Sequence, residues 1–445
     1  MSISIGLARV RSLDVRSLFA RTFSQPASFV LVSIFLFFEY IRPQGNYPSL
    51  NILPWARISL IAAFVACVIE GKSSFTLQRA WSLLAAFTAV IFVSIAQAPY
   101  PEFGFKTVDL WLSWLVIIYI ISSAADTEEK VILLIGAFIL WNFKMSFGGF
   151  RRWAAIGFRF RDWGLSGPSG WFQNSGEFGI EMCVFFPMAI YFLIGLQPHL
   201  TKWKRYFMGF VAVTAVASMA GSSSRGALLG GAAVGLWFLW RSPNRLKGSI
   251  YVGLLAISTW LILPEEQKAR FRSAGEDGTS QSRLTYWEDG IEIANDHPLF
   301  GIGYDNWMPF YTANYNPEGQ LPHNIFIEAV AELGYVGLAV FLALIVYVFW
   351  ENACTRRRTR RGGPNENRFV YFMAFGLDGA LIGYLVSGFF VTVLFYPYFW
   401  VNMAFTMALA TVARRPIGAP VRRVRRFGPI AGTARFDGAP APAPR

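Results

Sequence analysis

The stretch that decides the fold runs from Pro264 to Asn324 and ends in Leu321-Pro322-His323-Asn324. This polar segment of 61 residues carries ten of the 27 acidic residues and two of the three histidines. Long apolar runs precede and follow it. We therefore interpret it as the water-exposed half of an active site in a membrane protein.

The composition of the rest of the chain favours a membrane protein over a soluble globule. Of 445 residues, 54% are hydrophobic and only 15% are charged, and apolar runs near 20 residues in length recur, as in transmembrane helices. The net charge of +13 does not indicate a nucleic-acid partner. The basic residues lie in short loops between apolar runs, which is typical of membrane topology.

The apolar runs predict an all-α polytopic membrane protein with about twelve transmembrane helices and a large outer loop between the ninth and tenth. The predicted spans are 27–41, 56–70, 80–97, 106–123, 129–146, 177–196, 206–221, 226–241, 248–263, 324–351, 369–391 and 395–413. The chain then divides into a cytoplasmic segment (1–26), helices 1–9 (27–263), a catalytic loop (264–323), helices 10–12 (324–413) and a basic, disordered cytoplasmic tail (414–445).

The lysines and arginines predict the orientation of these spans. With the N-terminus in the cytoplasm, 27 of the 40 basic residues fall on the cytoplasmic side and 13 outside. Cytoplasmic loops are the ones enriched in Lys and Arg. We therefore expect both termini in the cytoplasm.

Two outer loops hold nine of the 13 outside bases. A ligand-binding surface and an interfacial helix whose arginines meet lipid headgroups both fit this pattern. In the first loop the basic residues alternate with aromatic ones. The arginines concerned are Arg151, Arg152, Arg159 and Arg161 in residues 144–176, and Arg270, Arg272 and Arg283 in the long polar segment, which also holds Lys268.

Between these loops, Gly221-Ser222-Ser223-Ser224-Arg225-Gly226 forms a tight turn between two apolar spans. A guanidinium exposed to hydrocarbon costs at least roughly 2.5 kcal/mol, so Arg225 should face a polar cavity or a partner. The small residues would let an anion approach backbone amides at the start of the next helix, which favours phosphate binding. A snorkelling arginine at a helix end is the alternative.

Inside the polar segment, Ser282 is placed to cap a helix that runs to about Asn295, which puts Arg283 in its first turn. A cation there opposes the helix dipole. An external anion shared by Arg283 and the helix N-terminus would resolve this misfit. A salt bridge to Glu276 or Asp277 would do so as well.

His323 follows Pro322 and precedes an apolar run, so we expect it in the first turn of a helix that re-enters the membrane. The positive end of a helix dipole lowers the proton affinity of an imidazole. A histidine kept neutral in this way can accept a proton from a hydroxyl. A capping or interfacial histidine is the alternative, whereas His297 is interpreted as structural.

The order of these motifs resembles the O-antigen ligase and polymerase superfamily, and the resemblance is strongest from Ser222 to Gly337. Glu39-Tyr40-Ile41-Arg42-Pro43-Gln44 also resembles O-antigen ligase-like proteins, without an assigned chemistry. The matching residues are Ser-Ser-Arg225-Gly before an apolar span, Arg283 with Trp287, His297-Pro298-Leu299-Phe300-Gly301-Ile302-Gly303, and His323-Asn324 followed by Glu332, Gly334 and Gly337.

The resemblance implies an inverting, metal-independent glycosyltransferase of the bacterial inner membrane that needs no cofactor. It would move a glycan from undecaprenyl diphosphate to a hydroxyl of the lipid A core on the periplasmic side. Arg225 and Arg283 would hold the donor diphosphate, and His323 would activate the acceptor. Because the outer loops lack a DxD-like acidic pair, arginines would neutralise the leaving group. Further substrate-binding candidates are Arg151, Arg152, Arg159, Arg161, Arg270, Arg272 and Asn324.

Other activities fit the same residues. An O-antigen or exopolysaccharide polymerase would use the same donor and a different acceptor, and a protein O-oligosaccharyltransferase would transfer to a protein hydroxyl. A membrane transporter is the alternative of another class. A transporter would be expected to show internal repeats or broken helices in matching halves, which the sequence does not show.

Overall fold

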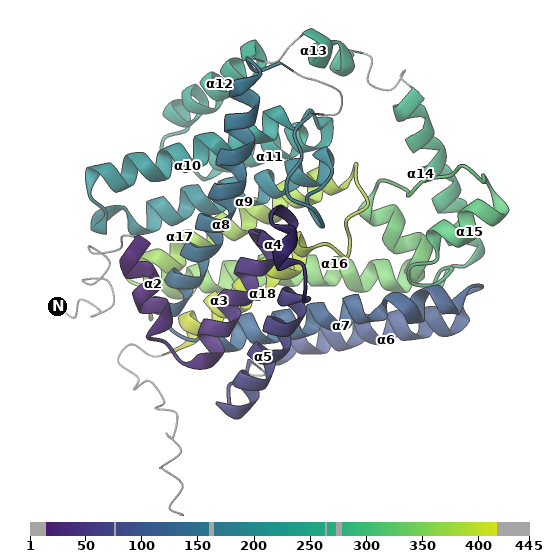
Figure 1. The fold of residues 1–445 in the computed structure, drawn as a ribbon, viewed down its shortest axis with the longest axis horizontal. Coiled ribbons are helices and arrows are strands. Elements are labelled where there is room, and N and C mark those ends of the chain that lie inside the picture. The colour runs from purple at the N-terminus through teal and green to yellow at the C-terminus, as the bar shows by residue number, and fades with distance from the viewer. Residues whose placement is uncertain (1–14, 75–76, 160–163, 263–264, 273–277, 416–445) are drawn as a thin grey trace, which may run out of the picture.

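The computed structural model describes residues 15–74, 77–159, 164–262, 265–272 and 278–415. Within these ranges the chain forms helices and no β-strand (Figure 1), which confirms the predicted all-α polytopic class. The helices are α2 (Val15–Phe23), α3 (Ala27–Tyr40), α4 (Pro43–Asn46), η2 (Pro48–Leu50), α5 (Trp55–Ile69), α6 (Gln78–Gln97), α7 (Pro101–Ala124), α8 (Glu128–Ala155), α9 (Ser175–Leu196), η3 (Gln197–His199), α10 (Lys202–Gly221), α11 (Arg225–Arg241), α12 (Arg245–Ile262), α13 (Glu265–Arg272), α14 (Gly278–Asp296), α15 (Trp307–Asn314), α16 (Ile325–Thr359), α17 (Arg368–Gly388) and α18 (Pro397–Arg414).

Each of the twelve predicted spans falls on one helix of the described chain. Seven segments there are long and apolar enough to cross a bilayer, so the count of twelve crossings stays a prediction. They are Ala27–Gly45, Gln78–Gln97, Pro101–Ala124, Glu128–Ala155, Ser175–His199, Ile325–Thr359 and Arg368–Gly388.

Helix α17 lies at the centre of the bundle, between α9 and α11. Gly376, Gly379 and Gly383 line one side of α17, where a Cβ atom at each would come within 3.0 Å of α9. A Cβ atom at Gly230 of α11 would lie 2.0 Å from Ser387 Oγ of α17. Small residues let helix backbones approach closely. In a lipid bilayer, the van der Waals packing that results is a main driving force for helix association.

The first and last described segments lie at the same end of the bundle. Arg21 of α2 lies 4.0 Å from Glu129 in the first turn of α8, and Arg415 after α18 lies 3.6 Å from Asp126 in the turn between α7 and α8. We call this the opposite end. Arg225, at the start of α11, and His323, before α16, lie at the other end, here named the site end. Helix α14, on the right of Figure 1, contacts Arg225 and the residue before His323. A shared end for these two described segments fits an even number of crossings between them.

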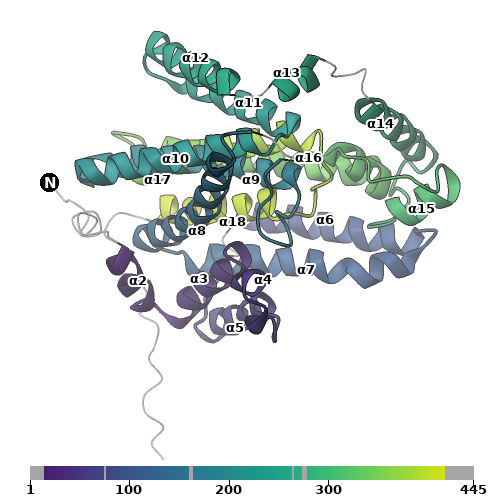
Figure 2. The ribbon, with the colours of Figure 1, turned by 45° about the horizontal axis from the view of Figure 1, so that its top comes forward.

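The described part of the polar segment from α14 onward packs against α16 at the site end (Figure 2). At Gly290 of α14 a Cβ atom would lie 2.4 Å from Ile327 Cγ2, so the two helices touch closely there. The Glu332 carboxylate of α16 accepts hydrogen bonds from the backbone N–H groups of Asp305 (3.1 Å) and Trp307 (3.0 Å). These contacts fix the position of α14 and α15 against the bundle.

Candidate active site

Arg225 is the first residue of α11, and a strained turn places it there. Ser223 has a positive φ of 60°, and the Ser224 hydroxyl accepts a hydrogen bond from the backbone N–H of Ala227 at 3.2 Å. This is a helix N-cap, which fixes where α11 begins. The Arg225 side chain extends to α14, where Nη2 donates to the Ser280 hydroxyl at 3.3 Å.

His323 lies in the short connection that leads into α16. Its backbone has a positive φ of 52°, and its N–H donates to Thr392 Oγ1 at 2.8 Å. The preceding carbonyl, of Pro322, accepts a hydrogen bond from Trp287 Nε1 of α14 at 2.9 Å. The loop that presents the imidazole is therefore held from two sides, by the loop after α17 and by α14.

One face of α14 connects these two positions. Ser280, Arg283 and Trp287 follow one another at i, i+3 and i+7, so their side chains lie on the same side of the helix. Ser280 contacts Arg225, and Trp287 contacts the residue before His323. Arg283 lies between them. The structure therefore brings the three central predicted residues around a single helix face.

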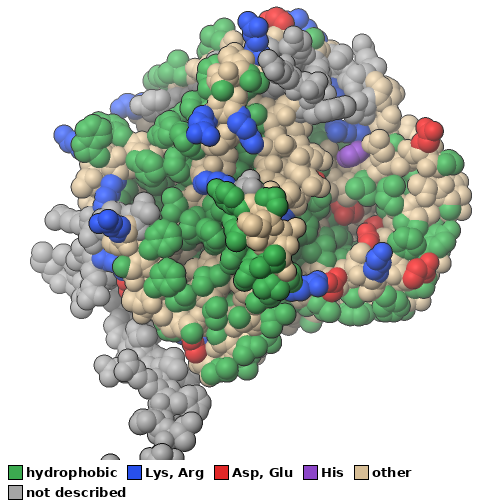
Figure 3. Space-filling model, viewed as in Figure 1, with side chains coloured by type: hydrophobic (Ala, Val, Ile, Leu, Met, Phe, Trp, Pro, Cys, Tyr) green, Lys and Arg blue, Asp and Glu red, His purple; other side chains and the backbone are tan. Residues whose placement is uncertain are grey.

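The electrostatics of His323 reflect this arrangement. Burial and, as the smaller cause, the positive charge of Arg283 together lower the pKa of His323 from 6.5 to about 4. An imidazole with this pKa is neutral at pH 7 and can accept a proton. Figure 3 shows histidine, basic and acidic side chains meeting in a hollow between α14 and the rest of the bundle.

Two details of the predicted local structure around His323 and Arg283 were wrong. His323 precedes α16 rather than lying in its first turn, and burial and Arg283, rather than the helix dipole, account for its low pKa. Helix α14 begins at Gly278, and the Ser282 hydroxyl donates to the Gly278 carbonyl at 2.9 Å within the helix. Ser282 is therefore no cap, and Arg283 lies beyond the first turn. Glu276 and Asp277 lie outside the described residues.

Asn324, predicted as a substrate ligand, caps α16 instead. Its Oδ1 accepts from the backbone N–H groups of Phe326 (2.8 Å) and Ile327 (3.3 Å), and the residue is 2% exposed. Asparagine is among the residues preferred at this position. The sequence pattern of Asn324 before an apolar run was sufficient to predict the cap.

The other predicted basic residues are not gathered around α14 in the described part of the chain. Arg152 Nη2 donates to the Ser166 carbonyl at 2.6 Å, and Arg272 lies 3.7 Å from Glu265 within α13. Arg151 at the end of α8 and Arg159 after it are exposed. Arg161 and the side chain of Arg270 lie outside the described residues.

The loop between α8 and α9 supports the turn before Arg225. Leu165 N–H donates to the Gly221 carbonyl at 2.9 Å. At Gly164, whose φ is +82°, a Cβ atom would lie 2.5 Å from the Ser222 carbonyl oxygen, so only glycine fits. This loop positions the start of α11.

The N-terminal motif holds the same loop, a contact that the sequence did not reveal. Trp171 Nε1 donates to the Glu39 carboxylate, and Arg42 Nη1 donates to the Ser169 carbonyl at 2.5 Å. Charged residues at the end of an apolar span were the visible signal in the sequence. Their partners lie more than 120 residues away, so the role of the motif depends on tertiary structure.

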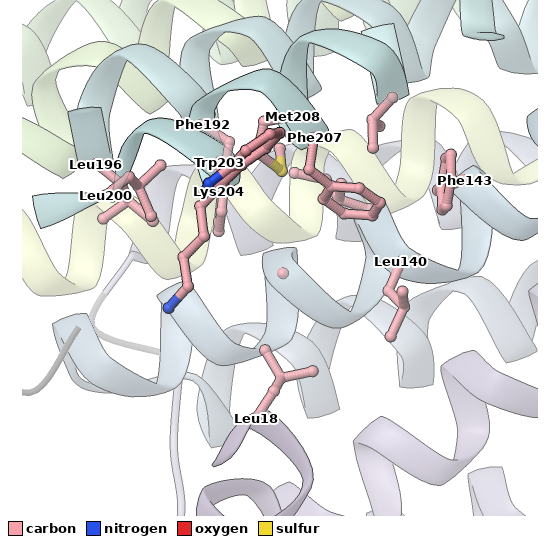
Figure 4. A pocket seen from close by; sticks show the side chains of 13 residues that line it. Leu18, Leu140, Phe143, Phe192, Leu196, Leu200, Trp203, Lys204, Phe207 and Met208 are labelled. Atoms are coloured by element: carbon pink, nitrogen blue, oxygen red, sulfur yellow. The ribbon is translucent and has the colours of Figure 1, made fainter. Parts of the chain in front are cut away.

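An apolar cavity of about 450 Å³ lies away from this site, between α2, α8, α9 and α10 (Figure 4). Trp203, Lys204 and Phe207 line it from the first turns of α10, and Leu18 faces them from α2. Arg225 follows the other end of α10. A 20-residue helix is about 30 Å long, so this cavity lies near the opposite end of the bundle.

Residues 187–342 match the family described as O-Antigen ligase, and this range includes Arg225, Arg283 and His323. The chain is also 24% identical, over 290 residues, to the Exopolysaccharide production protein ExoQ of Rhizobium meliloti (strain 1021). The chain is therefore similar to O-antigen ligase-like membrane proteins. The similarity to ExoQ covers 60% of this chain and 63% of that relative, which is less than two thirds of the relative's length. These similarities support the superfamily that the motifs predicted.

Proposed function

We propose that the protein is a glycosyltransferase that moves a glycan from a lipid-linked diphosphate to a hydroxyl acceptor. The observation that carries the proposal is the single face of α14 that joins Arg225, Arg283 and a neutral His323. This arrangement places positive charge and a proton acceptor beside each other, as transfer from a diphosphate to a hydroxyl requires.

The chemistry follows from the two kinds of side chain. The acceptor oxygen attacks the anomeric carbon of the donor while His323 removes its proton, so a new C–O bond forms. The bond from the anomeric carbon to the diphosphate oxygen breaks, and that oxygen keeps the electron pair. Arg225 and Arg283 stabilise the departing charge because a guanidinium pairs two phosphate oxygens and stays protonated. Attack from the face opposite the leaving group inverts the anomeric configuration.

The donor that fits the superfamily is undecaprenyl diphosphate carrying a glycan, and the acceptor of a ligase is the lipid A core. We place this chemistry on the periplasmic face of the inner membrane, with both termini in the cytoplasm. A polymerase that extends a lipid-linked polysaccharide is the second candidate. It is favoured by similarity to a relative named for exopolysaccharide production.

The test is His323→Ala in the intact membrane protein, with His297→Ala as the matched control. His297 lies in the same polar segment, with its ring 5.9 Å from that of Phe310, and is not part of the α14 face. Loss of a general base lowers rates by about 10²- to 10⁴-fold. We expect lipid-linked glycan to accumulate with unmodified acceptor in the His323 variant alone. Unchanged glycan attachment, with altered uptake of a solute, would instead support a transporter.

A further inference from the structure

A second cavity, with a polar lining, lies beside the loop between α8 and α9. It has a volume of about 370 Å³ and is formed by Arg42 after α3, by α4, by the segment that leads into α5 with the start of that helix, and by Ser169 of the loop. Figures 1 and 2 show α4 beside this loop. We call it the α4 pocket, and the residues that matter for its chemistry are Arg42, Gln44, Trp55, Arg57 and Ser169. Ligand pockets in proteins span about 300–1,000 Å³.

The charge of the lining favours an anion. Two arginines, Arg42 and Arg57, line the α4 pocket, and no acidic residue is among its lining residues. Arg42 is held in place, since its Nη1 donates to the Ser169 carbonyl and its guanidinium fills the space where a Cβ atom of Gly170 would lie. These contacts with Ser169 and Gly170 hold the Arg42 guanidinium beside the cavity.

Arg57 is available for exchange of partners. It pairs with Asp109 at 2.5 Å, but the two side chains are 65% and 59% exposed. Exposed ion pairs contribute little to stability, because water already solvates both charges. A ligand with a phosphate or carboxylate can therefore replace Asp109 at little cost, whereas a buried ion pair would resist such exchange.

A third lining residue points to a hydroxyl group on the ligand. Gln44 Oε1 is buried and has no hydrogen-bond partner among the described residues. A buried acceptor without a donor is unfavourable, so a ligand hydroxyl that donates to it would be favoured.

The rim of the α4 pocket adds an apolar requirement. Tyr47, Ile52 and Leu53, in the segment between α4 and α5, are 63%, 72% and 45% exposed. Large apolar side chains at the end of membrane helices contact lipid at the bilayer interface. The ligand therefore combines an anionic group, a hydroxyl and a hydrocarbon chain.

We propose that the α4 pocket binds the headgroup of an anionic glycolipid. The phosphate contacts Arg42 and Arg57, a sugar hydroxyl donates to Gln44, and the acyl chains lie along Tyr47 and Ile52. The loop that contributes Ser169 to the pocket also supports the turn before Arg225, through Leu165. That this lipid is the acceptor of the transfer reaction rests on the function proposed above.

The experiment measures binding of dioctanoyl phosphatidylinositol, which carries a phosphate, ring hydroxyls and short acyl chains, to the purified full-length protein by native mass spectrometry. Dioctanoyl phosphatidylcholine is the comparison lipid. We expect phosphatidylinositol to bind at least about tenfold more tightly, because charge-assisted hydrogen bonds are the strong ones. Equal binding of the two lipids would overturn the proposal.

Variants locate the site. Arg57→Gln should weaken phosphatidylinositol binding about tenfold, and Ala56→Phe should fill the pocket and abolish binding while both arginines remain. Lys106→Gln is the matched control, since it removes an exposed positive charge near the start of α7, at the same end of the bundle. Thermal unfolding confirms that each variant is folded. If Arg57→Gln and Lys106→Gln bind alike, the α4 pocket is not the site.

Two further measurements separate the possible outcomes. Soluble inositol 1-phosphate should compete weakly, and competition as strong as that of the lipid would refute the part of the proposal that requires acyl chains. His323→Ala should bind the probe as the wild type does. A wild-type protein that binds the probe but shows no transfer activity would remove the proposed function and leave the pocket standing. A wild-type protein that transfers glycan but does not bind the probe would remove the pocket and leave the proposed function standing.

Discussion

The acid limb of the pH–rate profile reports the pKa of the general base and therefore tests the candidate site directly. A pKa of about 4 for His323 predicts that roughly 97% of the imidazole is neutral at pH 5.5. An unperturbed histidine with a pKa of about 6.5 would be only about 9% neutral at that pH. If His323 is the general base, the rate at pH 5.5 should therefore stay close to the rate at pH 7.5, and it should fall only as the pH approaches 4.

Arg283→Gln tests the cause of this shift. Burial remains in the variant, but the nearby positive charge is gone, so the pKa of His323 rises and the acid limb moves toward neutral pH. Arg225→Gln is the control. Arg225 is not among the causes of the shift, so this variant should lower the rate at every pH and leave the limb in place.

The assay follows glycan transfer in single turnovers with purified protein and lipid-linked donor from pH 4 to pH 8. The pH at the midpoint of the acid limb is the quantity compared. Absolute rates are not compared, because both substitutions also lower the rate by weakening the binding of the diphosphate. A wild-type limb centred near pH 6.5 would refute the idea that a buried imidazole is the base. An identical limb in Arg283→Gln and wild type would refute the coupling of the two residues.

Two stability predictions follow from contacts away from the chemistry. Gly301→Ala should destabilise the site end by about 1–3 kcal/mol, because φ is +67° and a Cβ atom would lie 2.4 Å from the Glu332 carbonyl carbon, and thermal unfolding of the purified protein measures it. Asp126→Asn should cost about 3–5 kcal/mol, because it leaves Lys130 and Lys72 without the carboxylate that now lies 2.7 and 2.9 Å away. Burial opposes ionisation of Asp126, but these lysines outweigh it and lower the pKa, so the stabilisation is present above about pH 4 and is lost as the pH falls further. Melting temperatures that match wild type at pH 7 would contradict either prediction.

The sequence by itself determined which segments are helical and which are polar. Length and apolar content are local properties, so the twelve predicted spans each coincide with a helix of the described chain. The motif order also predicted Arg225, Arg283 and His323 as one set. Local signals misplaced the start of α14 by five residues, because a helix capped by Ser282 would begin at Arg283, whereas α14 begins at Gly278 and the Ser282 hydroxyl bonds back to the Gly278 carbonyl within the helix.

Only the tertiary structure decided how these residues meet. Arg225 and Ser280 are separated by 55 residues, and Glu39 and Trp171 by 132, and no local pattern specifies such pairs. The low pKa of His323 likewise depends on burial and on a charge from another helix. Helix formation follows from backbone hydrogen bonding within a segment, so a local stretch of sequence is enough to predict it. The site arises from close packing between segments that are distant in sequence, and no local stretch of sequence specifies that packing.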